Sequence, residues 1–332
     1  MAARRRGKKK SGRSYAWRYR GRIVACVFVE VIIICALVIM IGWNKGVKEW
    51  FEQFEQPVLK EVDISGINSP NAILMQARGG KILGEINGEA QIYPASMTKI
   101  MTVILGIENF DDLDEKITLT NEMFSGLYEQ DATQAGFQPG EEVRVIDLLY
   151  GAMLPSGAEC CIALADTISG SEADFAELMN KKAGKLGMEN THFCDSTGLH
   201  NPDHYSTVKD IAVLMKYCIK NDTFREIVET SRHSTGVTNI HPDGITYYST
   251  MFKNLSDPTV TGGKILGGKT GYTSEAGHCL VSFAEIEGRE YIFVSAGASG
   301  ADGNTIPHIQ DAVTIYNRVG AAIEAKMNNE NE

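Results

Sequence analysis

The stretch Tyr93–Lys99, with the sequence YPASMTK, is the most informative part of this chain. Pro94 favours the first turn of a helix, in which Ser96 and Lys99 lie on one face, one turn apart. A serine needs an adjacent base to act as a nucleophile, and Lys99 is such a base if burial and a neighbouring cation lower its pKa. The N–H groups at a helix start also suit a developing oxyanion. The spacing favours an activated serine, although a lone Ser-x-x-Lys pair also arises by chance on surface helices.

Two further motifs follow this serine in the chain. Residues 154–158 read LPSGA, in a loop between two apolar segments with helical spacing. Residues 268–273 read GKTGYT on an expected strand, where Lys269 and Thr270 present a cation and a hydroxyl to a carboxylate. Gly271 leaves room there for a substrate backbone. Taken alone, the first motif is an ordinary turn and the second is a glycine-rich turn with a solvated lysine.

In this order the three motifs resemble the signature of serine β-lactamases and penicillin-binding proteins. The similarity extends over about residues 66–325, through YPASMTKIMTVIL, LLYGAMLPSGAE, DSTGLHNPDHYSTVKDIAVLMKYC and GGKTGYTSEAGHCLVSFA. This part resembles the low-molecular-mass penicillin-binding proteins that are serine-type D-alanyl-D-alanine carboxypeptidases. The resemblance implies a hydrolase without a cofactor that removes the terminal D-alanine from peptidoglycan stem pentapeptides. It also implies that β-lactam antibiotics such as penicillin acylate the enzyme.

The resemblance assigns roles to the motif residues. Ser96 would be the acylated nucleophile, Lys99 its general base, and Ser156 the group that relays a proton to the leaving D-alanine. Lys269 would lower the pKa of Lys99. The substrate-binding residues would be Lys269, Thr270, Gly271, Tyr272 and Thr273.

Two details of the predicted site follow from the same resemblance. Lys269 and Thr270 would bind the terminal carboxylate, and the backbone N–H groups of Ser96 and Tyr272 would form the oxyanion hole. The family usually has Ser-x-Asn in its second motif, where the Asn binds the substrate amide and the lysine, but this chain has Ala158 at the third position. We therefore expect slow turnover, and whether the adjacent Glu159 substitutes for the amide is left open.

Strand-like patterns lie towards both ends of this part and helical patterns lie between them. Strands are expected at Ala72–Gln76, Lys81–Glu85, Gly268–Thr273, Cys279–Glu285 and Tyr291–Ala296. Helices are expected over residues 96–108, 145–153, 158–168, 172–186, 208–220 and 309–325. The pattern predicts an α/β (α+β) fold in which an antiparallel sheet, built from both chain ends, is flanked by helices and joined to an all-helical subdomain. The resemblance makes this fold β-lactamase/transpeptidase-like.

The beginning of the chain has the pattern of a membrane anchor. Residues 1–22 contain ten Lys and Arg and no acidic residue, and Ile23–Gly42 is apolar apart from Glu30. A helix of about 20 residues spans roughly 30 Å and crosses a bilayer. The basic flank predicts a cytoplasmic N-terminus and an external body. A cleaved signal peptide is the alternative, but the apolar run is long for one and no small-x-small cleavage site follows before Trp43.

These patterns divide the chain into five parts: a basic cytoplasmic tail (1–22), a transmembrane anchor (23–42), a connector (43–62), a D,D-peptidase catalytic domain (63–327) and a polar tail (328–332). We expect a single-pass protein of the cell membrane with an extracytoplasmic catalytic domain. The whole chain has a net charge of -10, so without the ten cations of residues 1–22 the remainder has -20. Such an acidic body argues against a nucleic-acid partner.

Metal chemistry is not expected from the remaining residues. His200 and His204 flank Pro202, which breaks the helix that would align them as ligands. Five cysteines fall in the external part without the spacing of zinc ligands, and either disulfides or free thiols fit them: Cys160, Cys161, Cys194, Cys218 and Cys279.

Two other functions remain open on the sequence. A β-lactamase would need a carboxylate that activates the deacylating water, and no Glu-x-x-x-Asn of the class A type stands out between the second and third motifs. A membrane-tethered, catalytically reduced scaffold that binds peptides would explain Ala158. The intact nucleophile and base, Ser96 and Lys99, argue against that scaffold because a pure binder needs neither.

Overall fold

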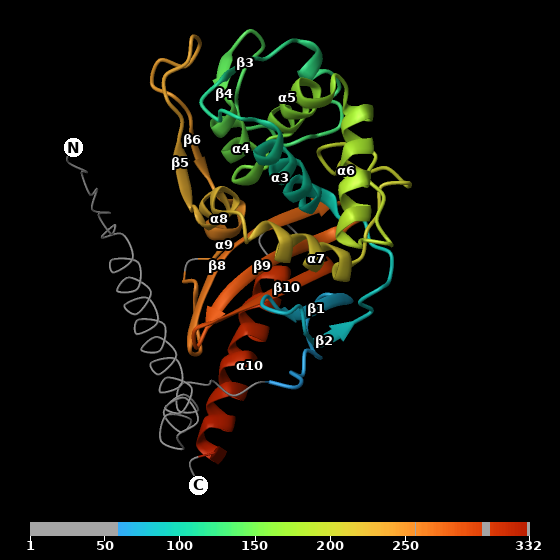
Figure 1. Ribbon diagram of the computed structural model, residues 1–332, viewed down its shortest axis with the longest axis vertical. Coiled ribbons are helices and arrows are strands. Elements are labelled where there is room, and N and C mark those ends of the chain that lie inside the picture. Colours follow the sequence, from blue (N-terminus) through green and yellow to red (C-terminus); the bar gives the residue numbers. More distant parts are fainter. Residues whose placement is uncertain (1–58, 256, 301–305, 331–332) are drawn as a thin grey trace, which may run out of the picture. The chain divides into compact units, whose positions relative to one another are not determined.

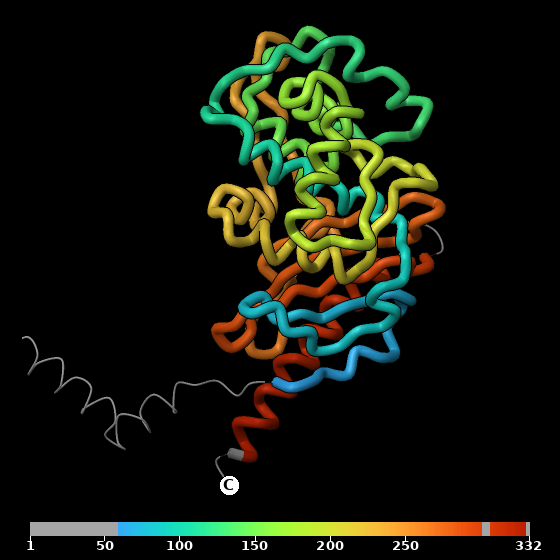
Figure 2. Tube along the Cα trace, turned by 45° about the vertical axis from the view of Figure 1, so that its right-hand side comes forward, coloured from blue at the N-terminus to red at the C-terminus, as the bar shows by residue number. Residues whose placement is uncertain are grey.

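A six-stranded antiparallel sheet with the order β2-β1-β10-β9-β8-β7 is at the centre of the structure, a computed structural model that describes residues 59–255, 257–300 and 306–330 (Figure 1). Its strands are β1 (Asn71–Gln76), β2 (Ile82–Ile86), β7 (Thr259–Val260), β8 (Gly263–Thr273), β9 (Gly277–Ile286) and β10 (Arg289–Ala298). Asn71 of β1 pairs with Ala296 of β10. The two views show the first strands beside the last ones (Figure 2), which confirms that both chain ends build the sheet.

The strands alternate their side chains between two hydrophobic clusters, as the period of two in a strand requires. Ile73 packs into the cluster that includes α3 (Lys99–Asn109), α7 (Val208–Cys218) and α8 (Asp222–Glu229). Its neighbour Leu74 packs into the cluster on the other face, which includes Ile315 and Tyr316 of α10 (Pro307–Glu330). Helices therefore cover both faces of the sheet.

A mainly helical subdomain continues beyond the first of these faces. It consists of α4 (Val145–Met153), α5 (Ala158–Ser169) and α6 (Glu172–Leu186), with α3 between them and the sheet (Figure 1). Residues Lys99–Gly106 of α3 are all buried. This is expected for a helix that is enclosed by other elements on every side and has no face exposed to solvent. This central position fixes the residues at the N-terminus of α3.

Short elements connect these larger parts. They are η1 (Ala95–Thr98), η2 (Glu122–Phe124), β3 (Lys116–Thr118), β4 (Glu142–Arg144), β5 (Arg232–Ser234), β6 (Thr246–Tyr248) and α9 (Thr250–Asn254). β3 pairs with β4, and β5 pairs with β6. The expectation of an all-helical subdomain therefore needs correction, since β3 and β4 lie within it. Strands of three residues are too short for an alternating pattern to be recognised in the sequence.

Three predicted boundaries differ from the structure. The helix expected over 96–108 begins as the 3-10 turn η1 and becomes α-helical only at Lys99. The last helix continues to Glu330, into the residues expected to be a polar tail. Residues 59–62, expected in the connector, belong to the body: Leu59 and Val62 are buried, and the Val62 N–H donates to the Leu83 carbonyl at 2.8 Å. The predicted membrane span 23–42 lies outside the described residues, among which no helix is long and apolar enough to cross a membrane.

One carboxylate joins the segment before β1 to the last helix. Asp311 of α10 is buried, and its two oxygens accept four hydrogen bonds at 2.6–2.9 Å from the backbone and side chains of Asn68 and Ser69. A charged acceptor strengthens each of these bonds. The contact ties the two ends of the described body together.

We predict that Asp311→Ala lowers the free energy of unfolding by about 3 kcal/mol, because it leaves buried donors without an acceptor. Asp311→Asn, which keeps one oxygen, should cost less. Urea unfolding followed by far-ultraviolet circular dichroism measures both, because the three tryptophans at 17, 43 and 50 all precede the described residues. Equal stability of Asp311→Ala and the parent protein would refute this role.

Candidate functional site

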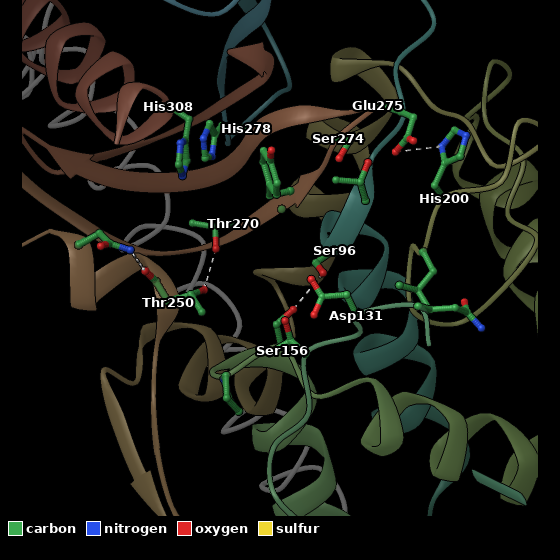
Figure 3. A pocket seen from close by; sticks show the side chains of 18 of the residues that line it. Ser96, Asp131, Ser156, His200, Thr250, Thr270, Ser274, Glu275, His278 and His308 are labelled. Atoms are coloured by element: carbon green, nitrogen blue, oxygen red, sulfur yellow. Dashed lines mark hydrogen bonds and ion pairs between the residues drawn. The ribbon is translucent and has the colours of Figure 1, made fainter. Parts of the chain in front are cut away.

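A cavity of ≈ 530 Å³ opens where the sheet meets the helical subdomain. Its lining comes from η1, the loop before α5, helix α9, strands β8 and β9, the loop between these two strands and the start of α10 (Figure 3). Ser96 and Ser156 both lie in it, together with Thr270, Gly271, Tyr272 and Thr273. The three sequence motifs are therefore brought together in one place.

Gly271 lets β8 approach the turn that holds Ser96. A Cβ atom on Gly271 would lie 3.0 Å from the Ser96 nitrogen, 3.1 Å from the Ala95 Cβ and 3.2 Å from the Pro94 oxygen. Ala95 itself has a φ of 47°, a conformation that costs a non-glycine residue free energy and occurs mainly at functional sites. The missing side chain thus allows β8 to approach the Ser96 turn, and because Gly271 also lines the cavity, room for a substrate backbone stays a prediction.

A continuous series of hydrogen bonds connects the predicted catalytic side chains. The Lys99 Nζ donates to the Ser96 Oγ at 3.0 Å, and the Ser156 Oγ donates to the same Ser96 Oγ at 3.0 Å. The Lys269 Nζ donates to the Ser156 Oγ at 3.0 Å. The Ser96 hydroxyl therefore contacts Lys99 directly and Lys269 through the Ser156 hydroxyl.

Both lysines are buried, and burial changes their basicity. Lys99 is 4% exposed and Lys269 is 1% exposed. Burial lowers the pKa of Lys99, against the opposing influence of nearby groups that include Asp195 and Glu159. Burial, and next the positive charge of Lys99, lower the pKa of Lys269 well below its ordinary value. A lysine with a lowered pKa has a lone pair available to accept a proton.

The loop that contains Asp195, Thr197 and Gly198 holds Lys99 in place. The Lys99 Nζ donates to the Thr197 carbonyl at 2.7 Å. The Asp195 Oδ1 accepts from the Thr197 N–H, the Thr197 hydroxyl and the Gly198 N–H, each at 2.7 Å. A Cβ on Gly198, whose φ is +81°, would lie 1.9 Å from the Ala95 oxygen. Only glycine fits at this contact between the loop and the Ser96 turn.

Ser156, in the second motif, has a strained backbone conformation. Ser156 has a φ of 73°, which is costly for a residue with a Cβ. Ala158 is buried at the start of α5. Glu159 is fully buried and does not line the cavity; its Oε1 accepts from the N–H groups of Ala135 and Gly136 at 2.6 and 2.9 Å. Glu159 thus anchors a loop at the edge of the cavity, and slow turnover as a result of Ala158 remains a prediction.

The predicted substrate-binding residues separate into two groups. Thr270, Gly271, Tyr272 and Thr273 line the cavity, and Tyr272 is 60% exposed. Lys269 is absent from the lining, and its Nζ also donates to the Thr270 carbonyl at 2.9 Å. Its predicted contact with a substrate carboxylate therefore stays a prediction.

Several lining residues come from segments without a recognised motif. They are Gln130, Asp131, Thr133, Pro155, Leu199, His200, Thr250, Asn254, Ser274, Glu275, His278, Ile306 and His308. The Thr250 and Thr270 hydroxyls are 2.7 Å apart and share a hydrogen bond. Residues this distant in sequence meet only through tertiary packing, so no local signal could identify them.

The histidines and cysteines set aside in the sequence have other contacts. His204 is buried, with its Nδ1 3.1 Å from the Asp195 Oδ2 and its Nε2 2.9 Å from the Thr98 Oγ1. Within the described ranges no group of three or more His, Cys, Asp or Glu residues could hold a metal ion. The five cysteines left open between disulfides and thiols are free thiols.

Comparison with known proteins identifies the family to which this fold and site belong. The profile of the peptidase S11 family, D-alanyl-D-alanine carboxypeptidase, matches residues 58–300. The chain belongs to this family. The D-alanyl-D-alanine carboxypeptidase DacF of Bacillus subtilis (strain 168) is 35% identical over 231 residues, which cover 69% of this chain and 57% of DacF. The D-alanyl-D-alanine carboxypeptidase of Streptomyces sp. (strain K15) is 37% identical over 231 residues, which cover 67% of this chain and 77% of that protein.

Solved structures of the family agree with the fold. The crystal structure of the Streptomyces K15 DD-transpeptidase superposes with a TM-score of 0.70 at 30% identity, covering 79% of this chain and 100% of that chain. The match to DacC of Escherichia coli (strain K12), 33% identical, covers 71% of this chain and 58% of that protein. The chain therefore spans less than two thirds of the length of DacF and DacC, so family membership, rather than the activity of either whole relative, is what these matches establish.

We predict that Asp195→Asn destabilises this member of the family by about 2 kcal/mol at pH 7. Burial alone would raise the pKa of Asp195, but hydrogen bonds from His204, Thr197 and Gly198 outweigh burial and lower it from 3.8 to about 2. Because the folded pKa is below the unfolded one, the stabilisation is present above pH 3.8 and is lost as the pH falls through about 2.

Urea unfolding at a series of pH values measures this difference. Asp203→Asn, in the same loop but exposed, is the matched control and should change stability little at any pH. A loss in Asp195→Asn that is the same at pH 7 and pH 2 would contradict the electrostatic origin of the effect.

Proposed function

We propose that the protein is a serine D-alanyl-D-alanine carboxypeptidase that removes the terminal D-alanine from peptidoglycan stem pentapeptides. The observation that supports this most directly is the hydrogen-bonded series from Lys99 through Ser96 and Ser156 to Lys269. It opens onto a cavity wide enough for a peptide end and belongs to a family described by this activity. β-Lactam antibiotics, whose acylating bond resembles the scissile peptide bond, are proposed to react at the same serine.

The acylation step uses the lowered pKa of Lys99. In its neutral form the Lys99 amine accepts the proton of the Ser96 hydroxyl, and the Ser96 Oγ forms a bond to the carbonyl carbon of the penultimate D-alanine. Backbone N–H groups of Ser96 and Tyr272 are proposed to stabilise the oxyanion. The arrangement needs no movement of the base, since the Nζ and Oγ atoms are already 3.0 Å apart.

Departure of the terminal D-alanine requires a proton on its amine. Ser156 is proposed to donate its proton there as the C–N bond breaks and to regain one from Lys269 or Lys99 through the same series of bonds. Water then hydrolyses the Ser96 ester, which releases the shortened peptide and restores the serine. The same residues argue against a pure peptide-binding scaffold, which would need neither the base nor the relay.

Penicillin labelling tests the assignment of the nucleophile. We predict that mass spectrometry of the full chain in detergent, after incubation with benzylpenicillin, finds a covalent adduct on Ser96. Ser96→Ala should abolish the adduct, and Lys99→Ala should slow its formation by several orders of magnitude because nucleophile and base act as one unit. Ser125→Ala, an exposed serine outside the cavity, is the control. Stoichiometric labelling of Ser96→Ala would refute the proposal.

We also propose that the protein is anchored in the cell membrane by residues 23–42, with its catalytic domain outside the cytoplasm. This rests on the apolar run and the ten cations that precede it. Protease added to intact cells should then degrade the body of the protein, and a cytoplasmic marker protein should survive. Protection of the body until the cells are lysed would contradict both the topology and the external substrate.

A further inference from the structure

Two histidines form one end of the cavity. His278 of β9 and His308, the second residue of α10, stack with ring centroids 5.0 Å apart and an interplanar angle of 5°. Tyr272 lies 4.7 Å from His278 between ring centroids. In Figure 3 the two imidazole rings lie side by side on the Thr270 side of Ser96. They therefore lie on the same side of the nucleophile as the Lys-Thr-Gly strand.

These histidines have no hydrogen-bond partner among the residues that the structure describes. His308 is only 6% exposed, and its Nδ1 is buried and unpaired. Unpaired polar atoms of buried side chains are rare because they lose their hydrogen bonds to water, and they commonly mark a place where a ligand or water binds. No contact within the described protein accounts for this pair.

The surroundings of the pair favour an anion. The Thr250 and Thr270 hydroxyls line the same end of the cavity, and since only one of their protons lies in the bond between them, the other is available to donate. The 24-residue helix α10 begins beside them with no acidic residue in its first turn, so the positive end of its dipole lies here. The carboxylate that follows, Asp311, acts on His308 electrostatically, but its oxygens are bonded to Asn68 and Ser69. Donors and a positive field thus coincide at this end.

The opposite end of the cavity has the reverse character. Glu275 and Asp131 line it, and Glu275 pairs only weakly with His200, at 3.9 Å. In Figure 3 Ser96 lies between these acidic residues and the His278–His308 pair. A peptide whose carboxylate lay near Glu275 would be repelled, so the charges select one direction of binding across Ser96.

We infer that His278 and His308, together with the Thr250 and Thr270 hydroxyls, bind the C-terminal carboxylate of the substrate. The inference rests on the proposed function, since it assigns recognition of the free C-terminus that distinguishes a carboxypeptidase from an endopeptidase. Lys269 is buried and absent from the lining, and its Nζ is directed to Ser156 and the Thr270 carbonyl. The histidine N–H groups and the threonine hydroxyl therefore provide the direct contacts.

Burial is compatible with this role. It lowers the pKa of His278, and burial together with the neighbouring His278 lowers the pKa of His308 to about 4. Both imidazoles are thus neutral at pH 7 in the free protein, and each has one N–H group to donate. A neutral donor pair binds a carboxylate without leaving a buried positive charge when the site is empty.

Equilibrium binding to the full-length Ser96→Ala protein in detergent tests the inference without requiring turnover. The probes are N-acetyl-D-alanyl-D-alanine and its C-terminal amide, measured by calorimetry. We expect the acid to bind roughly ten- to a hundredfold more tightly than the amide, as for a hydrogen bond to a charged group. Adding His278→Phe and His308→Phe, which keep a ring and remove the nitrogens, should bring this ratio close to one.

Two further variants guard against an indirect effect. His308→Gln keeps an N–H donor and should retain part of the preference for the acid, which a change of packing alone would not predict. His192→Phe, an exposed histidine outside the cavity, should leave the ratio unchanged. All variants are compared by circular dichroism to confirm that they fold.

The outcomes separate this inference from the proposed function. An unchanged ratio of acid to amide affinity in folded His278→Phe and His308→Phe would overturn the inference, even if Ser96 is labelled by penicillin. Equal affinity for acid and amide before the histidines are changed would also overturn it. Conversely, loss of the ratio in the histidine variants would support the carboxylate site even if Ser96 proved unreactive, in which case the proposed function alone would fail.

Discussion

The buried lysine pair is the constraint on which the rest of this structure depends. An ammonium group removed from water is costly unless oxygen atoms replace its hydration, and a second cation nearby increases that cost. Lys99 and Lys269 obtain these oxygens from the Ser96 and Ser156 hydroxyls and from the Thr197 and Thr270 carbonyls. Since the partners belong to η1, to two loops and to β8, the sheet and the helical subdomain must meet at hydrogen-bonding distance for both lysines to be satisfied.

The close contacts around the cleft serve this meeting. Gly271 brings β8 against the Ser96 turn, and Gly198 brings the loop that holds Lys99 against Ala95. Ala95 and Ser156, which also lie beside the cleft, adopt positive φ angles. Strained backbone is retained where the surrounding structure determines it fully, and here the central helix α3 and the sheet provide that support.

Much of the fold and part of the site could be predicted from the sequence. The strands and helices with clear periodicity were located within a few residues, and the three motifs correctly indicated that Ser96, Lys99, Ser156 and Lys269 come together. A serine three residues before a lysine is weak by itself, and it was the order of the three motifs along the chain that made the prediction specific. The three-residue strands β3 and β4 lack enough positions to show a pattern.

What could not be predicted depends on distant segments. The Thr197 carbonyl that holds Lys99 and the backbone N–H groups held by Glu159 are main-chain atoms without any residue signature. The stacking of His278 on His308 joins residues on β9 and α10 that share no motif. The close approach of Gly271 to the Ser96 turn is a tertiary contact that the motif itself does not indicate.

The pairing of β1 with β10 has a consequence for how the chain reaches its final state. Asn71 and Ala296 are 225 positions apart, so the centre of the sheet forms only when the last strands are available. Contacts of such long range slow folding. Until synthesis reaches β10 the nascent chain has no complete sheet. Asp311 lies still further along the chain. Its hydrogen bonds to Ser69, before β1, form only after the last helix, α10, has been synthesised.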